Sequence, residues 1–297
     1  MRAIEQRQGG GAMISVLFIV VIMSFLVLAI AETAARAAER QFAARTRSEL
    51  YWFAVGVEEL AEAALAEATS GEGSALTANN PIFGQVFQVP LDAGAAELAF
   101  ADATKCFNVN SFSRRGESGR DEANAQAQAA LVAFGESVGL GPSDLQGVVA
   151  AIADWIDSDA AQEPRGAEDG YYSVLPTPYR TGGAPLVDVS EIRAVAGVDA
   201  QLYSLLRPVL CARSEDALAS INLNLLTPAD APLLAALLGD VADVSAAQEI
   251  IASLPPGGYA SMDEFWASPA VEALPRGEDE NSELRSEVGD ALAVTSR

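Results

Sequence analysis

The sequence contains no histidine, two cysteines and a single lysine, Lys105. Without histidine, the most common zinc ligand and general base is missing, so a zinc site and histidine-based catalysis are almost excluded. Basic side chains are also scarce after the N-terminal region, because residues 48–297 carry 38 acidic and 12 basic side chains, a net charge of −26. A surface of that sign repels phosphate backbones and favours solubility or cation binding.

The motifs of common enzyme classes are missing as well. The chain has neither a G-x-S-x-G elbow nor a glycine loop that could cradle a phosphate, and no pocket-forming motif accompanies its many carboxylates. The sequence therefore predicts a protein that is not an enzyme.

The N-terminal region does contain a long uncharged run, residues 9–31, in which Leu, Ile, Val, Phe and Met dominate from residue 13 to residue 30. About 20 such residues, at 1.5 Å each, cross a hydrocarbon core of roughly 30 Å. Residues 32–68 follow without proline and are rich in Ala, Glu and Arg, which favour helix. We expect one continuous helix, embedded in a membrane first and amphipathic later.

Three kinds of N-terminal segment fit this pattern. A cleaved secretory signal is supported by the A-x-A site at residues 29–31 and by the basic head with Arg2 and Arg7, but its apolar core is long and the helix continues through the cut. A permanent signal anchor is the second interpretation. The third, which we favour, is a pilin-like leader that is short, basic and ends in glycine.

The leader resembles that of a known family. Residues 7–17, RQGGGAMISVL, are similar to the leader of the type II secretion minor pseudopilins of the K class. The resemblance implies that a prepilin peptidase cuts on the cytoplasmic side and methylates the new N-terminus. Matching the apolar registers puts the cut after Gly10, which makes Gly11 the first mature residue; Gly9 and Gly11 are alternative cleavage positions.

The fifth mature position then carries Ser15. Most pilins and pseudopilins have glutamate here, and the resemblance implies that this carboxylate pairs with the N-terminal amine of the preceding subunit, because either charge alone is costly in lipid. A subunit without the glutamate cannot pair with a subunit already in the fibre. As in the K class, we therefore expect this protein at the tip, above all other subunits.

The distribution of arginine conflicts with this orientation. Only Arg2 and Arg7 precede the apolar run, and counting basic residues would place the C-terminal side in the cytoplasm. We favour the orientation given by the leader, because Glu32 and Glu39 interleave the later arginines at helical spacing. The expected location is the inner membrane of a Gram-negative bacterium, with a single span and a periplasmic C-terminal part. The arginines that follow the span are Arg36, Arg40, Arg45 and Arg47.

A pilin-type layout follows the membrane span. Two strands are expected at residues 82–89 and 96–101. The amphipathic end of the long helix should pack on this small antiparallel sheet through an apolar stripe. The stripe consists of Phe53, Val57, Leu60 and Ala64.

An internal repeat follows. Residues 106–110, CFNVN, and residues 220–224, SINLN, share an apolar-Asn-apolar-Asn core, and each precedes helical sequence. We expect the helix at residues 143–156 to be capped by Ser143 or Asp144, behind Pro142. The predicted helices are residues 121–134, 143–156, 188–196, 200–206, 228–238, 245–254 and 261–266.

Several motifs in this region resemble the helical insert of the K class, so that the resemblance spans roughly residues 7–266. They include residues 154–159, DWIDSD, residues 166–172, GAEDGYY, and residues 221–224, INLN. The resemblance implies an α+β fold, in which a long N-terminal helix packs on a small antiparallel sheet and a large all-α insert contains SAM-like or helix-hairpin-helix-like units. The implied segments are a leader (1–10), a transmembrane part (11–31), the pseudopilin helix and first strands (32–105), a first helical domain with an acidic loop (106–219), a second helical unit (220–275) and a C-terminal segment (276–297).

The C-terminal end departs from the family pattern. Family members continue past a segment like residues 291–296 into closing strands, whereas this sequence stops at Arg297. We therefore expect an incomplete sheet and a truncated chain.

The two cysteines are Cys106 and Cys211, which lie 105 residues apart. In a chain that crosses a membrane this pair favours one long-range disulfide. Two free, buried thiols are the alternative.

An acidic loop is the candidate metal site. Six carboxylates lie within 16 residues, with Arg165 as the only positive counter-charge. Ca²⁺ takes six to eight oxygen ligands, and the resemblance implies calcium in this domain, although the spacing is not that of an EF-hand. A solvated acidic loop is the alternative. The candidate ligands are Asp154, Asp157, Asp159, Glu163, Glu168 and Asp169.

The function implied by the resemblance is structural. The protein would be a tip subunit of the pseudopilus that helps export folded proteins across the outer membrane, with other minor pseudopilins, the prepilin peptidase and the inner membrane as partners. A type IV pilus minor pilin is one alternative, but it should lack the long insert. A membrane-tethered helix-hairpin-helix DNA receptor is another, but residues 222–238 contain no Lys or Arg to hold phosphates, so we expect no nucleic-acid partner.

Overall fold

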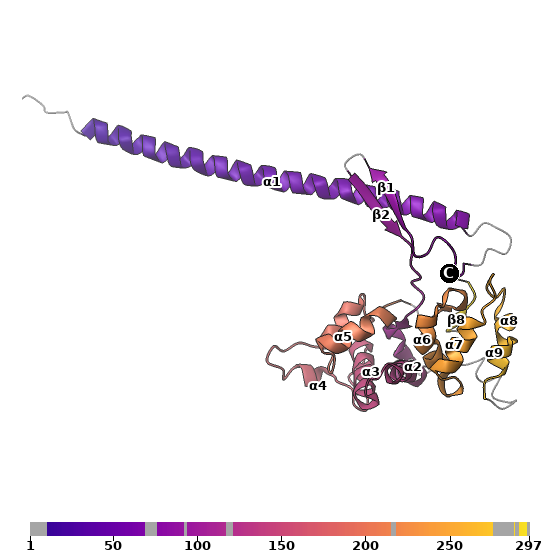
Figure 1. Ribbon diagram of the computed structural model, residues 1–297. Helices are drawn as coiled ribbons and strands as arrows, with labels where there is room; N and C mark the ends of the chain where they lie inside the picture. The colour runs from indigo at the N-terminus through magenta and orange to yellow at the C-terminus, as the bar shows by residue number, and fades with distance from the viewer. Residues whose placement is uncertain are drawn as a thin grey trace, which may run out of the picture. The chain divides into compact units, whose positions relative to one another are not determined.

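The computed structural model describes residues 11–68, 76–91, 94–116, 121–214, 218–275, 288 and 291–295. The described residues divide into two compact units. The first contains the N-terminal helix up to Ala64 together with residues 88–98, and the second contains the rest of the chain. Figure 1 labels the α-helices and some of the strands of both units.

The first unit is built on helix α1, Gly11–Ala68, which runs without a break, as the sequence predicts. At 1.5 Å per residue its 58 residues extend about 87 Å. Its N-terminal part is long and apolar enough to cross a membrane, and its apolar side chains lie exposed on the isolated chain. Beyond that part, the side-chain pairs Arg36–Glu32 (2.6 Å) and Arg45–Glu49 (2.9 Å) join successive turns.

A two-stranded sheet accompanies this helix. It consists of β1, Val86–Leu91, and β2, Gly94–Ala99, so both predicted strands exist with shifted ends. The predicted apolar stripe is right only at its start. Phe53 and Val57 are half-buried, whereas Leu60 is 56% exposed and Ala64 is also exposed.

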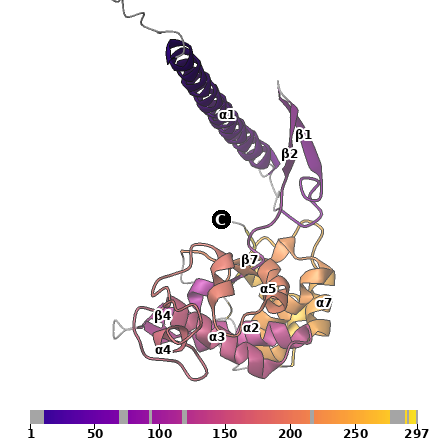
Figure 2. The same ribbon diagram turned by 90° about the vertical axis from the view of Figure 1, so that its left-hand side faces the viewer.

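The second unit consists of short helices and very short strands (Figures 1 and 2). Its buried side chains form a continuous apolar core. Its first half contains β3 Phe107–Asn108, η1 Val109–Ser111, β4 Ser113–Arg115, β5 Asp121–Ala123, α2 Ala125–Ser137, α3 Pro142–Ile156, α4 Asp169–Tyr172, η2 Val189–Ala194, α5 Ala200–Leu206, η3 Arg207–Val209 and β6 Leu210–Cys211. Its second half contains β7 Ile221–Asn222, η4 Leu223–Leu225, η5 Pro228–Asp230, α6 Ala231–Leu238, η6 Gly239–Val241, α7 Val244–Ala252, α8 Met262–Trp266, α9 Pro269–Glu272 and β8 Leu292–Ala293.

The predicted helices exist, but some of their boundaries and types differ. The helix predicted from residue 121 begins at Ala125, because residues 121–123 pair with β4 instead and the Asn124 side chain caps the helix. The cap predicted at Ser143 or Asp144 is wrong, because α3 starts at Pro142 behind Gly141. The helix predicted at 188–196 is a 3-10 helix, capped by Asp188, and the one predicted at 228–238 opens with the 3-10 turn η5.

The repeated double-asparagine motif has the same structure in both halves. Asn108 and Asn222 each accept a hydrogen bond from the backbone N–H two residues later, at 3.2 and 3.0 Å. Asn110 exchanges two hydrogen bonds with the backbone of Leu186 and donates a third to the carbonyl of Arg213. The second asparagine of the other motif, Asn224, does the same with Tyr259 and Val294. The repeated sequence motif therefore corresponds to a repeated structure.

Each half is closed by a short parallel ladder. In the first half Phe107 pairs with Leu210, and in the second half Ile221 pairs with Leu292. The insert is thus mixed helix and strand, not all-α as expected. Residues beyond 275, assigned from sequence to a separate segment, supply β8, the closing strand of the second half.

A disulfide joins Cys106 to Cys211 beside the first ladder, with a Cα–Cα distance of 5.6 Å. The disulfide predicted from the sequence is therefore present, and the alternative of two free thiols is wrong. By the loop-entropy model, a bond that closes a loop of this size stabilises the folded chain by about 5 kcal/mol.

Candidate cation site

Three carboxylates meet where helix α3 ends and helix α4 begins. Asp154 lies in the last turn of α3, Asp157 caps its C-terminus, and Glu168 caps the N-terminus of α4. One oxygen from each lies within 4.8 Å of the others. Asp154 is 0%, Glu168 7% and Asp157 9% exposed, so three acidic groups share one small buried volume.

Each of these carboxylates has one buried oxygen without a hydrogen-bond partner among the described residues. These atoms are Asp154 Oδ2, Asp157 Oδ1 and Glu168 Oε1. Asp154 Oδ1 accepts from the backbone N–H of Glu163 at 2.9 Å, and Glu168 Oε2 accepts from that of Asp169 at 3.1 Å. Within the described part of the chain no Lys or Arg forms a salt bridge with any of the three. Buried charges without partners are costly, so this cluster requires protons or a cation.

The electrostatics of the cluster favour the same conclusion. Burial raises the pKa of Asp157 to about 7, and the negative charges of Asp159, Glu168 and Asp154 add to the effect. Burial is also the largest cause of the raised pKa values of Asp154 and Glu168. A bound cation would reverse these shifts, because it stabilises the ionised carboxylates.

The other three predicted ligands have different roles in this structure. Asp159 is exposed and accepts from the N–H of Ala161 at 2.7 Å. Glu163 contributes its backbone N–H to Asp154. Asp169 accepts from the N–H and hydroxyl of Thr181 at 3.0 and 3.2 Å, and its other oxygen lies 3.4 Å from an Arg180 nitrogen. The structure therefore brings together three of the six predicted side chains.

The residues present fit a hard divalent cation such as Ca²⁺. Oxygens bound to one Ca²⁺ at 2.3–2.6 Å lie at most about 5 Å apart, and the three carboxylates meet this condition. Each has one oxygen that no donor among the described residues satisfies, and this oxygen can serve as a ligand. The donors are all oxygen, which suits Ca²⁺ better than softer metals.

An aromatic wall supports the site from the side of α4. The ring of Trp155 lies 5.2 Å from that of Tyr172, which is fully buried and accepts a hydrogen bond from the N–H of Ala196 at 3.0 Å. Burial raises the pKa of Tyr172 to about 12, so this residue stays neutral. Gly183 lies in the segment after α4, and its N–H donates to the Trp155 carbonyl at 3.0 Å. This hydrogen bond holds the segment against α3.

Sequence reasoning did not assign a role to Gly166, which contacts this site. A Cβ atom on Gly166 would lie 2.1 Å from Asp154 Oδ2. The preceding residue, Arg165, has a φ of 72° and is the only non-glycine residue with positive φ in the described ranges. An Arg-Gly turn inside an acidic loop was the available sequence signal.

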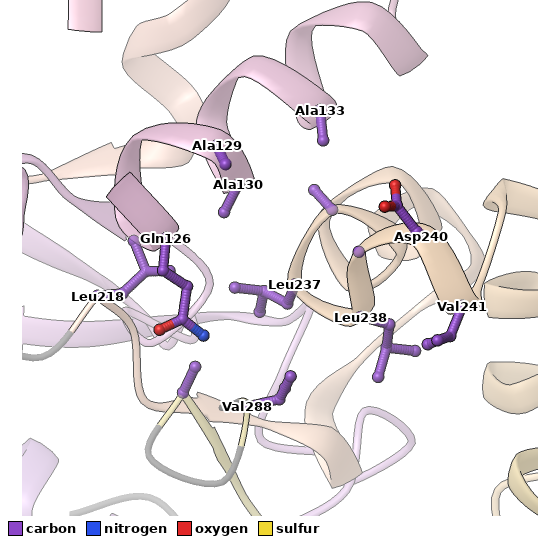
Figure 3. Close-up of a pocket in the computed structure, with 13 residues that line it drawn as sticks. Gln126, Ala129, Ala130, Ala133, Leu218, Leu237, Leu238, Asp240, Val241 and Val288 are labelled. Carbon is purple, nitrogen blue, oxygen red and sulfur yellow. The ribbon is translucent and has the colours of Figure 1, made fainter. Parts of the chain in front are cut away.

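A separate cavity of about 400 Å³ lies between α2 and the α6–η6 segment (Figure 3). Figure 3 shows Ala129, Ala130 and Ala133 on one side and Leu237 and Leu238 on the other. Most of its lining residues are Ala, Leu and Val, and none of the three clustered carboxylates is among them. The cavity thus brings no second group of titratable side chains together among its lining residues.

The N-terminal candidate residues lie at the start of α1. Gly10 lies outside the described residues, and Gly11 is the first residue of the helix. The Ser15 hydroxyl donates to the Gly11 carbonyl at 2.9 Å, so its hydrogen bond is made within the helix. The first carboxylate in this helix is Glu32, two residues past the apolar run 13–30.

Known proteins similar to this chain come from one secretion system. Family models described as type II secretion system (T2SS), protein K match residues 105–215 and 221–285. Type II secretion system protein K of *Pectobacterium carotovorum* subsp. *carotovorum* is 34% identical over 263 residues, which cover 87% of this chain and 79% of that protein. The *Klebsiella pneumoniae* protein K is 34% identical over 272 residues, covering 90% and 82%.

A solved structure agrees with these relatives. A chain in the crystal structure of the GspK-GspI-GspJ complex from the enterotoxigenic *Escherichia coli* type 2 secretion system superimposes with a TM-score of 0.70 and 26% identity. The match covers 86% of this chain and 85% of that chain. The relatives are named as secretion-system components and not as enzymes. The mixed fold, the apolar N-terminal helix and these similarities establish that the chain belongs to the protein K family of type II secretion systems, the minor pseudopilins of the K class.

Proposed function

We propose that this protein is the tip subunit of the type II secretion pseudopilus and assists export of folded proteins from the periplasm across the outer membrane. Helix α1 would anchor it in the inner membrane, after a prepilin peptidase has cut behind Gly10 and methylated Gly11. Support comes from the family and from the apolar N-terminal part of α1, which is long enough to cross a membrane.

Ser15 is the observation that carries the proposal. Its hydroxyl is paired with Gly11 inside the same helix, and no carboxylate lies nearby in the apolar run. A subunit of this kind brings no buried charge that needs the amine of another subunit. It is therefore suited to the end of a helical stack, where other subunits join from one side only.

Other minor pseudopilins are the proposed partners, as in the GspK-GspI-GspJ complex of enterotoxigenic *Escherichia coli*. Small side chains on α1 would let partner helices approach closely. The two halves of the insert would act as SAM-like protein modules that cover the fibre end. Nucleic acid is an unsuitable ligand, since residues 222–238 lack Lys and Arg. The small residues are Ala34, Ala35, Ala37, Ala38, Ala43 and Ala44.

Co-purification tests the assembly. The full-length protein would be expressed with the other minor pseudopilins of its own secretion system and purified in detergent. We expect a stable complex, and secretion of exoproteins to stop when the gene is removed. Failure to co-purify with any of them, together with normal secretion, would contradict the proposal.

A substitution tests the cleavage site. Gly10→Phe should leave a full-length precursor, because a bulky side chain blocks the peptidase, whereas Gly56→Ala, at a helical glycine with open space around it, should be processed normally. N-terminal sequencing and mass spectrometry of the mature chain measure both. Mature material beginning at Glu32 would contradict retention of the apolar helix.

We also propose that Asp154, Asp157 and Glu168 bind Ca²⁺. Their three unpaired buried oxygens support this assignment. Asp159, Glu163 and Asp169 remain further candidates from the sequence. Calorimetry on the full-length protein in detergent should detect Ca²⁺ binding that Asp157→Asn abolishes and that Asp240→Asn, on the exposed surface of the second half, leaves intact. Absence of binding in the unsubstituted protein would refute the site.

A further inference from the structure

The loop between α3 and α4 approaches the carboxylate cluster most closely at Gly166. The side-chain oxygen Asp154 Oδ2 occupies the place where a Cβ atom of residue 166 would lie, 2.1 Å away. The carboxyl carbon of Asp154 is at 2.8 Å from the same position. Both distances are shorter than real Cβ contacts, so any side chain here would displace the carboxylate or the loop.

Several interactions hold the loop in this position. The N–H of Gly166 donates to the Glu163 carbonyl at 2.9 Å, and the Gln162 side chain donates to the Gly166 carbonyl at 2.7 Å. The Arg165 guanidinium donates to the Gln146 side chain, one turn after the start of α3. Arg165 itself adopts the left-handed conformation, which is unfavourable for a residue with a Cβ. The surrounding contacts thus maintain a turn that its own backbone disfavours.

This turn and the cluster share Asp154. The backbone of Glu163, at the start of the turn, donates to Asp154 Oδ1, and Gly166, at its end, faces Asp154 Oδ2. Asp154 is fully buried, and its Oδ2 has no hydrogen-bond partner in the part of the chain that the structure describes. The position of the turn therefore determines where the Asp154 carboxylate lies, and with it the oxygen that can bind a cation.

We propose that Gly166 is a positioning residue of the cation site, which acts by leaving space for the Asp154 carboxylate to face Asp157 and Glu168. The proposal rests on Ca²⁺ binding by this cluster, as inferred above. Gly166 itself supplies no ligand through a side chain. Its effect is to allow the turn to close over Asp154 without moving it.

Tb³⁺ luminescence tests this role in the full-length protein in detergent. Tb³⁺ replaces Ca²⁺ at oxygen sites, and Trp155, next to Asp154, would sensitise its emission. We expect Gly166→Ala to weaken Tb³⁺ binding at least tenfold, with Ca²⁺ competing in the same ratio. Gly170→Ala is the matched control, because this glycine of α4 has no atom of another described residue within 4 Å of its Cβ position. It should change binding less than twofold.

The outcomes separate the two proposals. If the unsubstituted protein binds no Tb³⁺ or Ca²⁺, the calcium proposal fails. If it binds and Gly166→Ala binds as tightly as Gly170→Ala, the calcium site stands and the positioning role is overturned.

A second pair of variants covers the case in which Gly166→Ala folds poorly. The clash involves Asp154, so adding Gly166→Ala to Asp154→Ala should not change the unfolding temperature measured in chelator. Gly166→Ala alone should lower it. An equal decrease in both backgrounds would overturn the proposal, because Gly166 would then act independently of Asp154.

Discussion

The two halves of the insert share the same asparagine hydrogen bonds to the backbone, but the rest of their stability comes from different interactions. Asn110 and Asn224 make equivalent bonds to the backbone in their own halves. The first half adds the Cys106–Cys211 disulfide and the carboxylate cluster. In the second half α6 is instead buried over nearly its whole surface and carries no charged residue.

The difference shows how one scaffold reaches stability by two routes. Each leucine buried in α6 contributes about 2 kcal/mol, independently of redox state, pH or metal. The first half contains buried charge, which opposes folding unless it is neutralised, and a covalent bond that needs an oxidising compartment. The first half should therefore respond to its environment, and the second should not.

The largest expected effect comes from the disulfide. Replacing Cys106 and Cys211 by Ala should destabilise the first half by about 5 kcal/mol, because the unfolded chain regains the freedom of a long loop. Denaturation of the full-length protein in detergent would be followed by Trp155 in the first half and Trp266 in the second, with Trp52→Phe removing the third tryptophan. Equal loss at both reporters would show that the halves unfold together.

Replacing either of the equivalent asparagines, Asn110 or Asn224, should destabilise its own half by the same amount. Asn110→Ala and Asn224→Ala each leave one backbone N–H and two carbonyls without their partner, which should cost about 3 kcal/mol in either half. The same tryptophan reporters measure this. Costs that differ by more than twofold would mean that the repeat is similar in geometry but not in energetics.

The pH dependence should again distinguish the halves. The folded-state pKa of Asp157 is raised to about 7, so the folded state binds its proton more tightly than the unfolded state. Its contribution is fully present below about pH 4 and is lost as pH rises towards 7. In chelator the first half should lose about 3 kcal/mol between pH 4.5 and pH 7.0.

Bound Ca²⁺ should remove this loss of stability, because the cation balances the negative charge that protons neutralise at low pH. The Trp266 signal should change little, since the three clustered carboxylates all belong to the first half. Unfolding midpoints at pH 4.5 and 7.0, with and without Ca²⁺, measure both halves. A first half whose stability increases between these pH values in chelator would contradict the assignment.

The sequence predicted the features that depend on local pattern. An uninterrupted apolar run followed by Ala, Glu and Arg could only form a long helix, and α1 is that helix. The double-asparagine echo predicted a repeat, since Asn side chains replace backbone partners at turns. The acidic loop was found from charge density alone, and the cluster of Asp154, Asp157 and Glu168 lies within it.

The features that the sequence did not predict depend on contacts between distant segments. The sequence of residues 121–123 predicts the start of a helix, but these residues form a strand that pairs with β4. The pairing of Leu292 with Ile221 spans 71 residues and involves two-residue strands that leave no periodic pattern. Gly166 could not be assigned, because its role depends on the oxygen of Asp154 that fills the space beside it.

The smallest expected effect would make the two halves more alike. The parallel ladders align Asn108 with Cys211 and Asn222 with Ala293, so Ser220 and Ala293 correspond to Cys106 and Cys211. Ser220→Cys with Ala293→Cys should therefore form a disulfide and stabilise the second half by about 1–2 kcal/mol, since engineered bonds deliver less than native ones. Mass spectrometry without reductant detects the bond, and the Trp266 midpoint measures the gain. Two free thiols in this variant would mean that the ladders share a register but not the side-chain geometry that a disulfide needs.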